Sequence, residues 1–194
     1  HYQPVAERRI HEIPQIGVVN GLGVQPDGSG LLLMIEASVK KGAGGLTVTG
    51  ILEEEELKGR QGSYKRKSNA RTAAETVLTL LEEFGFSKEA YAVHLHFPGG
   101  IPVDGPSAGL AMFLAVYSAF TGTPVPHDIA LTGEITLHGQ VLPVGGVEEK
   151  IKAAAAAGAK RVWIPQENAK EAYQQMEIEV IPVKEVQEVL EAVF

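Results

Sequence analysis

The sequence contains no cysteine, which excludes disulfides and thiolate metal sites. No apolar run reaches the length of a membrane-spanning helix, and the first residues lack the pattern of a signal peptide. An excess of basic residues is also missing, since the formal net charge is −7. This charge argues against non-specific binding of nucleic acid through a basic face. Internal repeats and low-complexity segments are absent from the sequence.

What the chain does contain is the composition of a soluble globular protein, with 44% hydrophobic and 21% charged residues. A length of 194 residues fits one ordinary domain with a sizeable core. We expect residues 1–14 to be a lead-in or linker and residues 15–194 to form the domain. The opening on His1 rather than Met suggests a fragment of something longer.

The first half of the chain favours strands and hairpins. A strong turn signal, Asp27-Gly28-Ser29-Gly30, separates two strands expected at 16–24 and 31–38. Further strands are expected at 46–52 and 91–97. Between them, apolar residues at three- and four-residue steps predict a helix over 66–84, which Gly85 ends.

Strands and helices alternate in the second half, which indicates an α/β architecture. We expect strands at 161–164 and 178–182, a hairpin over 129–142 that turns at His138-Gly139, and helices at 110–120, 147–157, 166–176 and 183–194.

His94 and His96 alternate with apolar residues in an expected strand, so their side chains should share one face. Two histidines alone do not make a metal site, and no third ligand stands at a telling spacing. We therefore expect core or supporting histidines, and no metal.

The segment 98–109 reads PGGIPVDGPSAG and runs into the apolar helix. Pro106 suits a first helical position, which places Ser107 in the first turn, among backbone N–H groups without intrahelical partners. These donors and the positive end of the helix dipole favour negative charge beside the hydroxyl, as a nucleophile with an oxyanion site requires. The alternative is an ordinary serine that satisfies the backbone at a helix start.

Two short motifs overlap this segment, and neither fits well. The G-x-S-x-G pattern of esterases matches 105–109, but Pro102 and Pro106 interrupt the strand that should run into the serine. Only His127 and His138 follow it as possible triad members. A phosphate-binding loop would need a lysine where Pro106 stands, which excludes nucleotide binding here.

A better partner for the serine is Lys150, in the opening turn of the helix expected at 147–157. There the helix dipole opposes a positive charge. Together with desolvation, it would lower the lysine pKa from about 10.4 toward neutrality. A neutral amine can accept the proton of Ser107, which is the Ser-Lys variant of triad chemistry. The alternative is an ordinary surface lysine, and charge alone does not decide between the two.

The DGPSAG around Ser107, the ALTGEITLHGQVLPVGGVEEKI around Lys150 and their separation of 43 positions resemble the proteolytic domain of Lon protease. The PGGIPVDGPSAG form most resembles the B-type bacterial Lons. The resemblance covers almost the whole chain and implies the fold of the second domain of ribosomal protein S5. It also implies Ser107 as nucleophile and Lys150 as general base, with Thr132 orienting the lysine amine. The backbone N–H groups of Ser107 and Ala108 would hold the oxyanion, and Asp104 would shape the loop.

The resemblance further implies a cytoplasmic serine endopeptidase that acts on unfolded or damaged polypeptides as a homo-hexamer. In that family an ATPase domain is attached N-terminally. No intact Walker A sequence is present here, so ATP and Mg²⁺ are expected only in such a separate domain, and no cofactor in this chain. A-type Lons carry an acidic residue where this chain has the run from Gly62 to Arg66, so the chain departs from the A-type pattern in this segment. The competing class is a silent Lon-like assembly or binding module, although such relatives lose the serine or the lysine and this chain keeps both.

Overall fold

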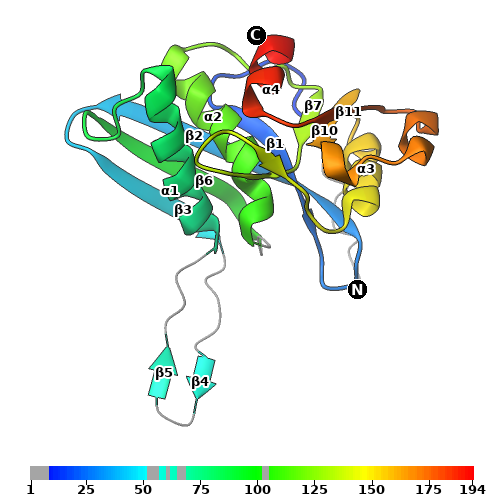
Figure 1. Cartoon of the computed structure of the whole chain (residues 1–194), viewed down its shortest axis with the longest axis horizontal. Coiled ribbons are helices and arrows are strands. Elements are labelled where there is room, and N and C mark those ends of the chain that lie inside the picture. Colours follow the sequence, from blue (N-terminus) through cyan, green and yellow to red (C-terminus); the bar gives the residue numbers. More distant parts are fainter. Residues whose placement is uncertain (1–8, 52–56, 60–61, 65–68, 102–104) are drawn as a thin grey trace.

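A seven-stranded sheet forms the centre of the chain, in the order β11-β10-β7-β1-β2-β6-β3 (Figure 1). The computed structural model describes residues 9–51, 57–59, 62–64, 69–101 and 105–194. Strands β1 and β2, and β2 and β6, are antiparallel, while the other four neighbouring pairs are parallel. The strands of this sheet are β1 (Val18–Val24), β2 (Gly30–Lys41), β3 (Gly45–Ile51), β6 (Tyr91–Ile101), β7 (Ile129–Leu131), β10 (Arg161–Pro165) and β11 (Glu179–Val183).

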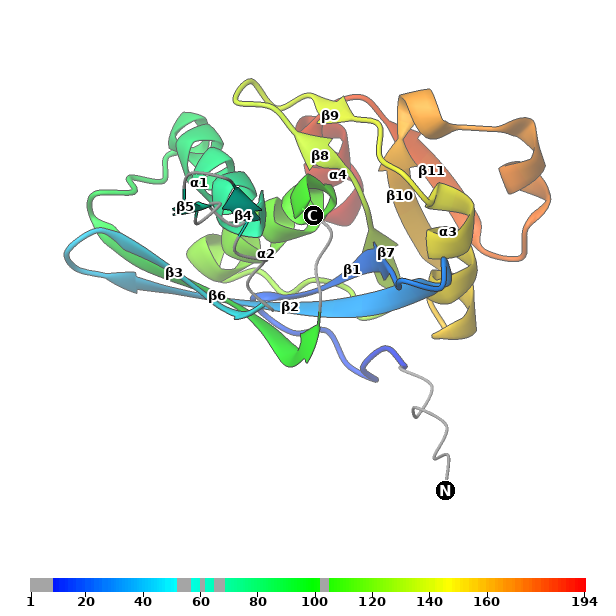
Figure 2. The same cartoon turned by 90° about the horizontal axis from the view of Figure 1, so that it is seen from below.

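Helices cover both faces of this sheet (Figure 2). One face packs against α1 (Asn69–Leu81), α2 (Gly109–Thr121) and α4 (Val186–Val193), and this contact forms the larger apolar core. The other face packs against α3 (Val147–Ala156) through a second core that includes Leu22, Ala130 and Val162. Within the described part of the chain, none of the helices is long and apolar enough to cross a membrane. The mixed α/β class expected from the sequence is confirmed.

The β1–β2 hairpin forms where the sequence predicts it, with Val24 opposite Gly30. The side-chain carboxylate of Asp27 accepts hydrogen bonds from the backbone N–H and the hydroxyl of Ser29. These bonds stabilise the charged form and hold the pKa of Asp27 below its usual value. The local turn chemistry therefore sets the register of this hairpin.

The helix expected at 66–84 is observed from Asn69 onward as α1, followed by a 3-10 turn, η1 (Glu82–Phe84), while residues 66–68 lie outside the described residues. Gly85 ends it in the left-handed conformation, with φ 88°. Two further sheets have two short strands each. One pairs β4 (Leu57–Gly59) with β5 (Gly62–Tyr64), and the other pairs β8 (Glu134–Ile135) with β9 (Val141–Leu142).

The expected hairpin over 129–142 is only partly correct. Its first three residues form β7, which is buried on both faces and pairs in parallel with β1 and β10. The chain leaves the central sheet at Thr132, and only β8 and β9 form the hairpin, which turns at Gly139 with φ 86°. An uninterrupted apolar run of this kind is typical of a central parallel strand.

The prediction of a helix over residues 166–176 is wrong. Two 3-10 turns, η3 (Gln166–Asn168) and η4 (Glu171–Gln175), stand there, with extended backbone at Ala169 and Lys170. The side-chain amide of Asn168 donates to the carbonyl of Val144 and its oxygen accepts from the N–H of Val144, each at 2.9 Å. This tertiary contact fixes a conformation that a continuous helix could not supply. Similarly, α4 begins at Val186 rather than at 183, because Val183 still pairs with Pro165 in the sheet.

Gly30 determines how closely α3 approaches the hairpin. A Cβ at this position would lie 2.1 Å from the carbonyl oxygen of Glu149 in the first turn of α3. Gly30→Ala should therefore displace that turn and lower the free energy of unfolding by about 2 kcal/mol, or Tm by roughly 4–8 °C. Thermal unfolding measures this.

The matched control is Gly45→Ala, because a Cβ there meets no atom within 4 Å. It should leave Tm unchanged or raise it slightly. Equal Tm values for the Gly30→Ala and Gly45→Ala variants would show that the close approach of α3 does not depend on the missing side chain.

Candidate functional site

The parallel strands β7, β1 and β10 are neighbours, so their carboxyl ends lie side by side at the same end of the sheet. In open α/β sheets this end is where ligands bind. Two segments from opposite faces reach it, since both α3 and the 3-10 turn η2 (Gly105–Ala108) contact β1. Figure 2 shows α2, which follows η2, and α3 on either side of β7.

Ser107 lies in η2 and only 5% of its surface is exposed. Its backbone carbonyl accepts a hydrogen bond from the N–H of Gly133 at 3.0 Å, and the carbonyl of Gly133 accepts one from Leu110 at 3.0 Å. Gly109 allows this approach, because a Cβ there would lie 3.2 Å from the Cγ1 of Ile135. The serine was expected in the first turn of the α-helix, and it instead occupies the 3-10 turn just before α2.

Thr132 follows the last residue of β7 and has no exposed surface. Its N–H donates to the carbonyl of Trp163 in β10 at 3.1 Å. Among the described residues, its hydroxyl has no hydrogen-bond partner. A buried hydroxyl without a partner is costly, so this atom is available to a polar group at the site.

Lys150 has no exposed surface either, although it carries an ionisable amine. Its backbone N–H donates to the carbonyl of Gly146, the left-handed residue that begins α3. The buried residues of α3 are Val147, Lys150, Ile151 and Ala154, which fall on one helix face. The lysine therefore takes a position that a core residue would normally fill.

The interpretation of Lys150 as an ordinary surface lysine is wrong, because its side chain is buried. The neighbouring Lys152 does behave in that way, and pairs with Glu148 at 3.9 Å and Glu149 at 3.5 Å on the exposed side. The spacing of Val147, Lys150 and Ile151 indicates this burial, and charge reasoning at the helix start missed it.

Among the predicted site residues, Ser107 and Thr132 are brought close together, because Gly133, which follows Thr132, donates its N–H to the carbonyl of Ser107. The helix that carries Lys150, α3, packs on the other face of the sheet and contacts β1, as η2 also does. Asp104 lies outside the described residues.

His94 and His96 share a face of β6, as expected, and both bond the hydroxyl of Thr49 in β3, at 2.8 and 2.7 Å. His94 is exposed and is not a core residue. Within the described ranges, no cluster of three or more metal-ligating side chains is found. Through Thr49, these histidines join strands β6 and β3.

The histidines that an esterase triad would need are not beside Ser107. His127 lies at the amino end of β7. Ser107 lies near the opposite end of this strand, where its carbonyl accepts a hydrogen bond from Gly133. His138 is exposed at the turn of the β8–β9 hairpin, where Gly139 lies against Val186 of α4. The geometry gives no support to the esterase hypothesis.

Comparison with known proteins matches residues 3–194 to the family model described as the Lon protease (S16) C-terminal proteolytic domain. The chain is 47% identical over 194 residues to Lon protease 2 of Bacillus subtilis (strain 168), which covers 98% of this chain and 35% of that protein. It is 42% identical over 185 residues to Lon protease of Brucella suis biovar 1 (strain 1330), covering 91% of this chain and 21% of that protein.

A third relative, Lon protease of Clostridioides difficile (strain 630), is 45% identical over 158 residues, or 79% of this chain and 19% of that protein. The chain thus spans about a third or less of the length of these relatives. From a match over nearly its whole length, the chain belongs to the family of Lon protease C-terminal proteolytic domains, which are peptidases.

Proposed function

We propose that the chain is a serine endopeptidase domain in which Ser107 is the nucleophile and Lys150 the general base. The observation that carries this proposal is the complete burial of the Lys150 side chain in α3, a helix that contacts β1, as does η2, which contains Ser107. Burial disfavours the charged ammonium form of this side chain. A neutral amine at this place can accept a proton at moderate pH.

In the proposed reaction, the Lys150 amine takes the hydroxyl proton while Ser107 Oγ bonds to the carbonyl carbon of the peptide. The amine then gives this proton to the departing amine of the substrate as the C–N bond breaks, which leaves an acyl-enzyme. A water molecule next attacks the ester. Lys150 accepts its proton and returns it to Ser107 Oγ, which restores the starting state.

Two groups assist these steps in our proposal. The Thr132 hydroxyl accepts a hydrogen bond from the Lys150 amine and so directs its lone pair. The backbone N–H groups of Ser107 and Ala108, in η2 just before α2, donate to the oxyanion of each tetrahedral intermediate. Asp104 would fix the loop before the serine, which is a proposal from the family resemblance alone.

The wider assembly is also proposed. The relatives are Lon proteases several times longer than this chain. We propose that the domain acts in a homo-hexamer in the cytoplasm, where an attached ATPase delivers unfolded or damaged polypeptides. ATP and Mg²⁺ would act in that separate domain, and the peptidase residues need no cofactor.

Ser107→Ala should lower turnover of a fluorogenic peptide or of casein by at least about a thousandfold, because the nucleophile is lost. Lys150→Ala should have a comparable effect, since without the amine the serine proton has no acceptor. Equal turnover by wild type and both variants would refute the dyad. No turnover by wild type would instead favour the silent assembly module.

Lys150→Met separates the chemical role of the lysine from its packing. Methionine keeps most of the volume of the buried side chain and removes the amine. Turnover should fall as far as in Lys150→Ala, while Tm stays equal or rises, because a buried polar group has been replaced by an apolar one. A large loss of Tm would instead assign Lys150 a structural role.

Thr132→Val replaces the proposed orienting hydroxyl by a methyl group of similar shape. Losing one hydrogen bond to the reacting amine should lower kcat by roughly 10- to 100-fold. Thr132→Ser, which keeps the hydroxyl, should recover most of the activity. Equal rates for the valine and serine variants would contradict the proposed role.

A further inference from the structure

The tip of the β1–β2 hairpin lies against the first turn of α3 (Figure 2). Val24 is the last residue of β1 and pairs with Gly30, the first residue of β2. The turn between them has its own hydrogen bonds, from the N–H of Gln25 to the carbonyl of Ser29 at 2.8 Å and from the N–H of Gly28 to the carbonyl of Gln25 at 2.9 Å. The tip is therefore a defined structure that can support a neighbouring element.

Val24 contacts the residue at which α3 begins. Gly146 has φ 66°, a left-handed conformation that glycine adopts without strain. A Cβ on Gly146 would lie 2.5 Å from Cγ2 of Val24, so this methyl group fills the space beside the glycine. The carbonyl of Gly146 accepts the N–H of Lys150 at 3.0 Å, and this hydrogen bond closes the first turn of the helix. Val24 thus contacts the acceptor end of that turn.

Gly30 contacts the other end of the same turn. A Cβ on Gly30 would lie 2.1 Å from the carbonyl oxygen of Glu149, the residue before Lys150, and 2.9 Å from the Cβ of Ala153. The missing side chain therefore lets the backbone of β2 touch the backbone of α3. The hairpin tip contacts α3 at both ends of the hydrogen bond that fixes the main chain of Lys150.

We propose that Val24 is a positioning residue for Lys150, because the hairpin tip holds the first turn of α3 and so keeps the amine in place and away from water. The inference rests on the proposed peptidase function and adds to it a residue that acts through the backbone of α3. A misplacement of about 1 Å is enough to lower a catalytic rate strongly.

Loosening this turn would also change the surroundings of the amine. The Lys150 side chain has no exposed surface, so a turn that moves away from the hairpin would admit water to it. Water stabilises the ammonium form, and the amine would then become neutral only at higher pH.

The test measures kcat and KM of a fluorogenic peptide as a function of pH. If Lys150 is the base, kcat rises with pH through one limb, whose midpoint reports its deprotonation. Val24→Ala removes the methyl group beside Gly146, so this midpoint should move up by about half a unit and kcat below it should fall about threefold. KM should stay unchanged.

Two further variants examine the same contact. Val24→Ile keeps the Cγ2 methyl group and should restore the wild-type profile. Gly30→Ala displaces the first turn of α3 from its other end and should move the midpoint in the same direction as Val24→Ala.

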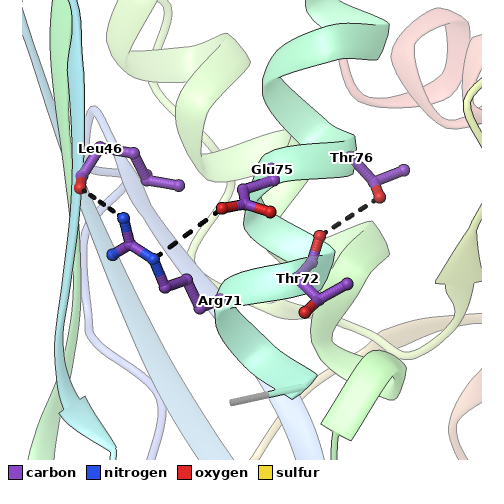
Figure 3. Close-up of polar contacts among 5 residues, drawn as sticks. All are labelled: Leu46, Arg71, Thr72, Glu75 and Thr76. Atoms are coloured by element: carbon purple, nitrogen blue, oxygen red, sulfur yellow. Dashed lines mark hydrogen bonds and ion pairs between the residues drawn. The ribbon is translucent and has the colours of Figure 1, made fainter. Parts of the chain in front are cut away.

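Two controls separate positioning from a general loss of stability. Val18→Ala makes the same truncation on the same face of β1, at the end of the strand remote from the hairpin tip. Arg71→Ala acts on α1, across the sheet from α3, where the guanidinium donates to the carbonyl of Leu46 in β3 at 3.4 Å and pairs with Glu75 at 3.9 Å (Figure 3). Both should lower Tm, as Val24→Ala does, and leave the midpoint unchanged.

A midpoint that Val24→Ala does not move, or that Val18→Ala or Arg71→Ala moves equally, would overturn the positioning role. It would leave the dyad intact as long as Ser107→Ala and Lys150→Met abolish turnover. No turnover by wild type, or turnover that survives either of these last two variants, would overturn the proposed peptidase chemistry and with it this inference.

Discussion

The complete burial of the Lys150 side chain is the constraint on which the account of this site depends. A charged ammonium without exposed surface would cost several kcal/mol of desolvation, whereas a neutral amine costs much less. Lys150 also lies in the first turn of α3, where the helix dipole opposes a positive charge. The fold therefore holds the proposed base in a place where an apolar core residue would be more stable, which is typical of functional sites.

The central sheet lies between the two segments that the proposed reaction requires. Ser107 comes from the face that α1, α2 and α4 cover, and Lys150 comes from the face that α3 covers. Both reach β1, and β7 ends between them at Thr132. Gly30 and Gly133 allow this close packing, because a Cβ at either would collide with α3 or with the β8–β9 hairpin. Small residues in the scaffold are thus as necessary to the site as its reactive groups.

Local patterns in the sequence predict a large part of this structure. The turn at Asp27, the amphipathic face of α1 and the alternation of strands and helices are all observed. Two elements depend on contacts that no local pattern contains. The side chain of Asn168 bonds Val144, 24 residues away, and breaks an expected helix into two turns, while β7 joins the central sheet instead of its own hairpin. For the site, the spacing of residues in α3 indicates that Lys150 lies on its apolar face, whereas the hydrogen bond between Ser107 and Gly133 joins segments that no local pattern connects.

The most direct measurement is the titration of the Lys150 amine itself. In a chain labelled with ¹³C and ¹⁵N at lysine, its Cε and Nζ resonances can be assigned by their absence from Lys150→Met and followed by NMR as a function of pH. The account predicts a titration well below the ordinary lysine value of about 10.4, so that the amine is largely neutral where the enzyme works. An amine that stays charged up to that ordinary value would contradict its role as the base.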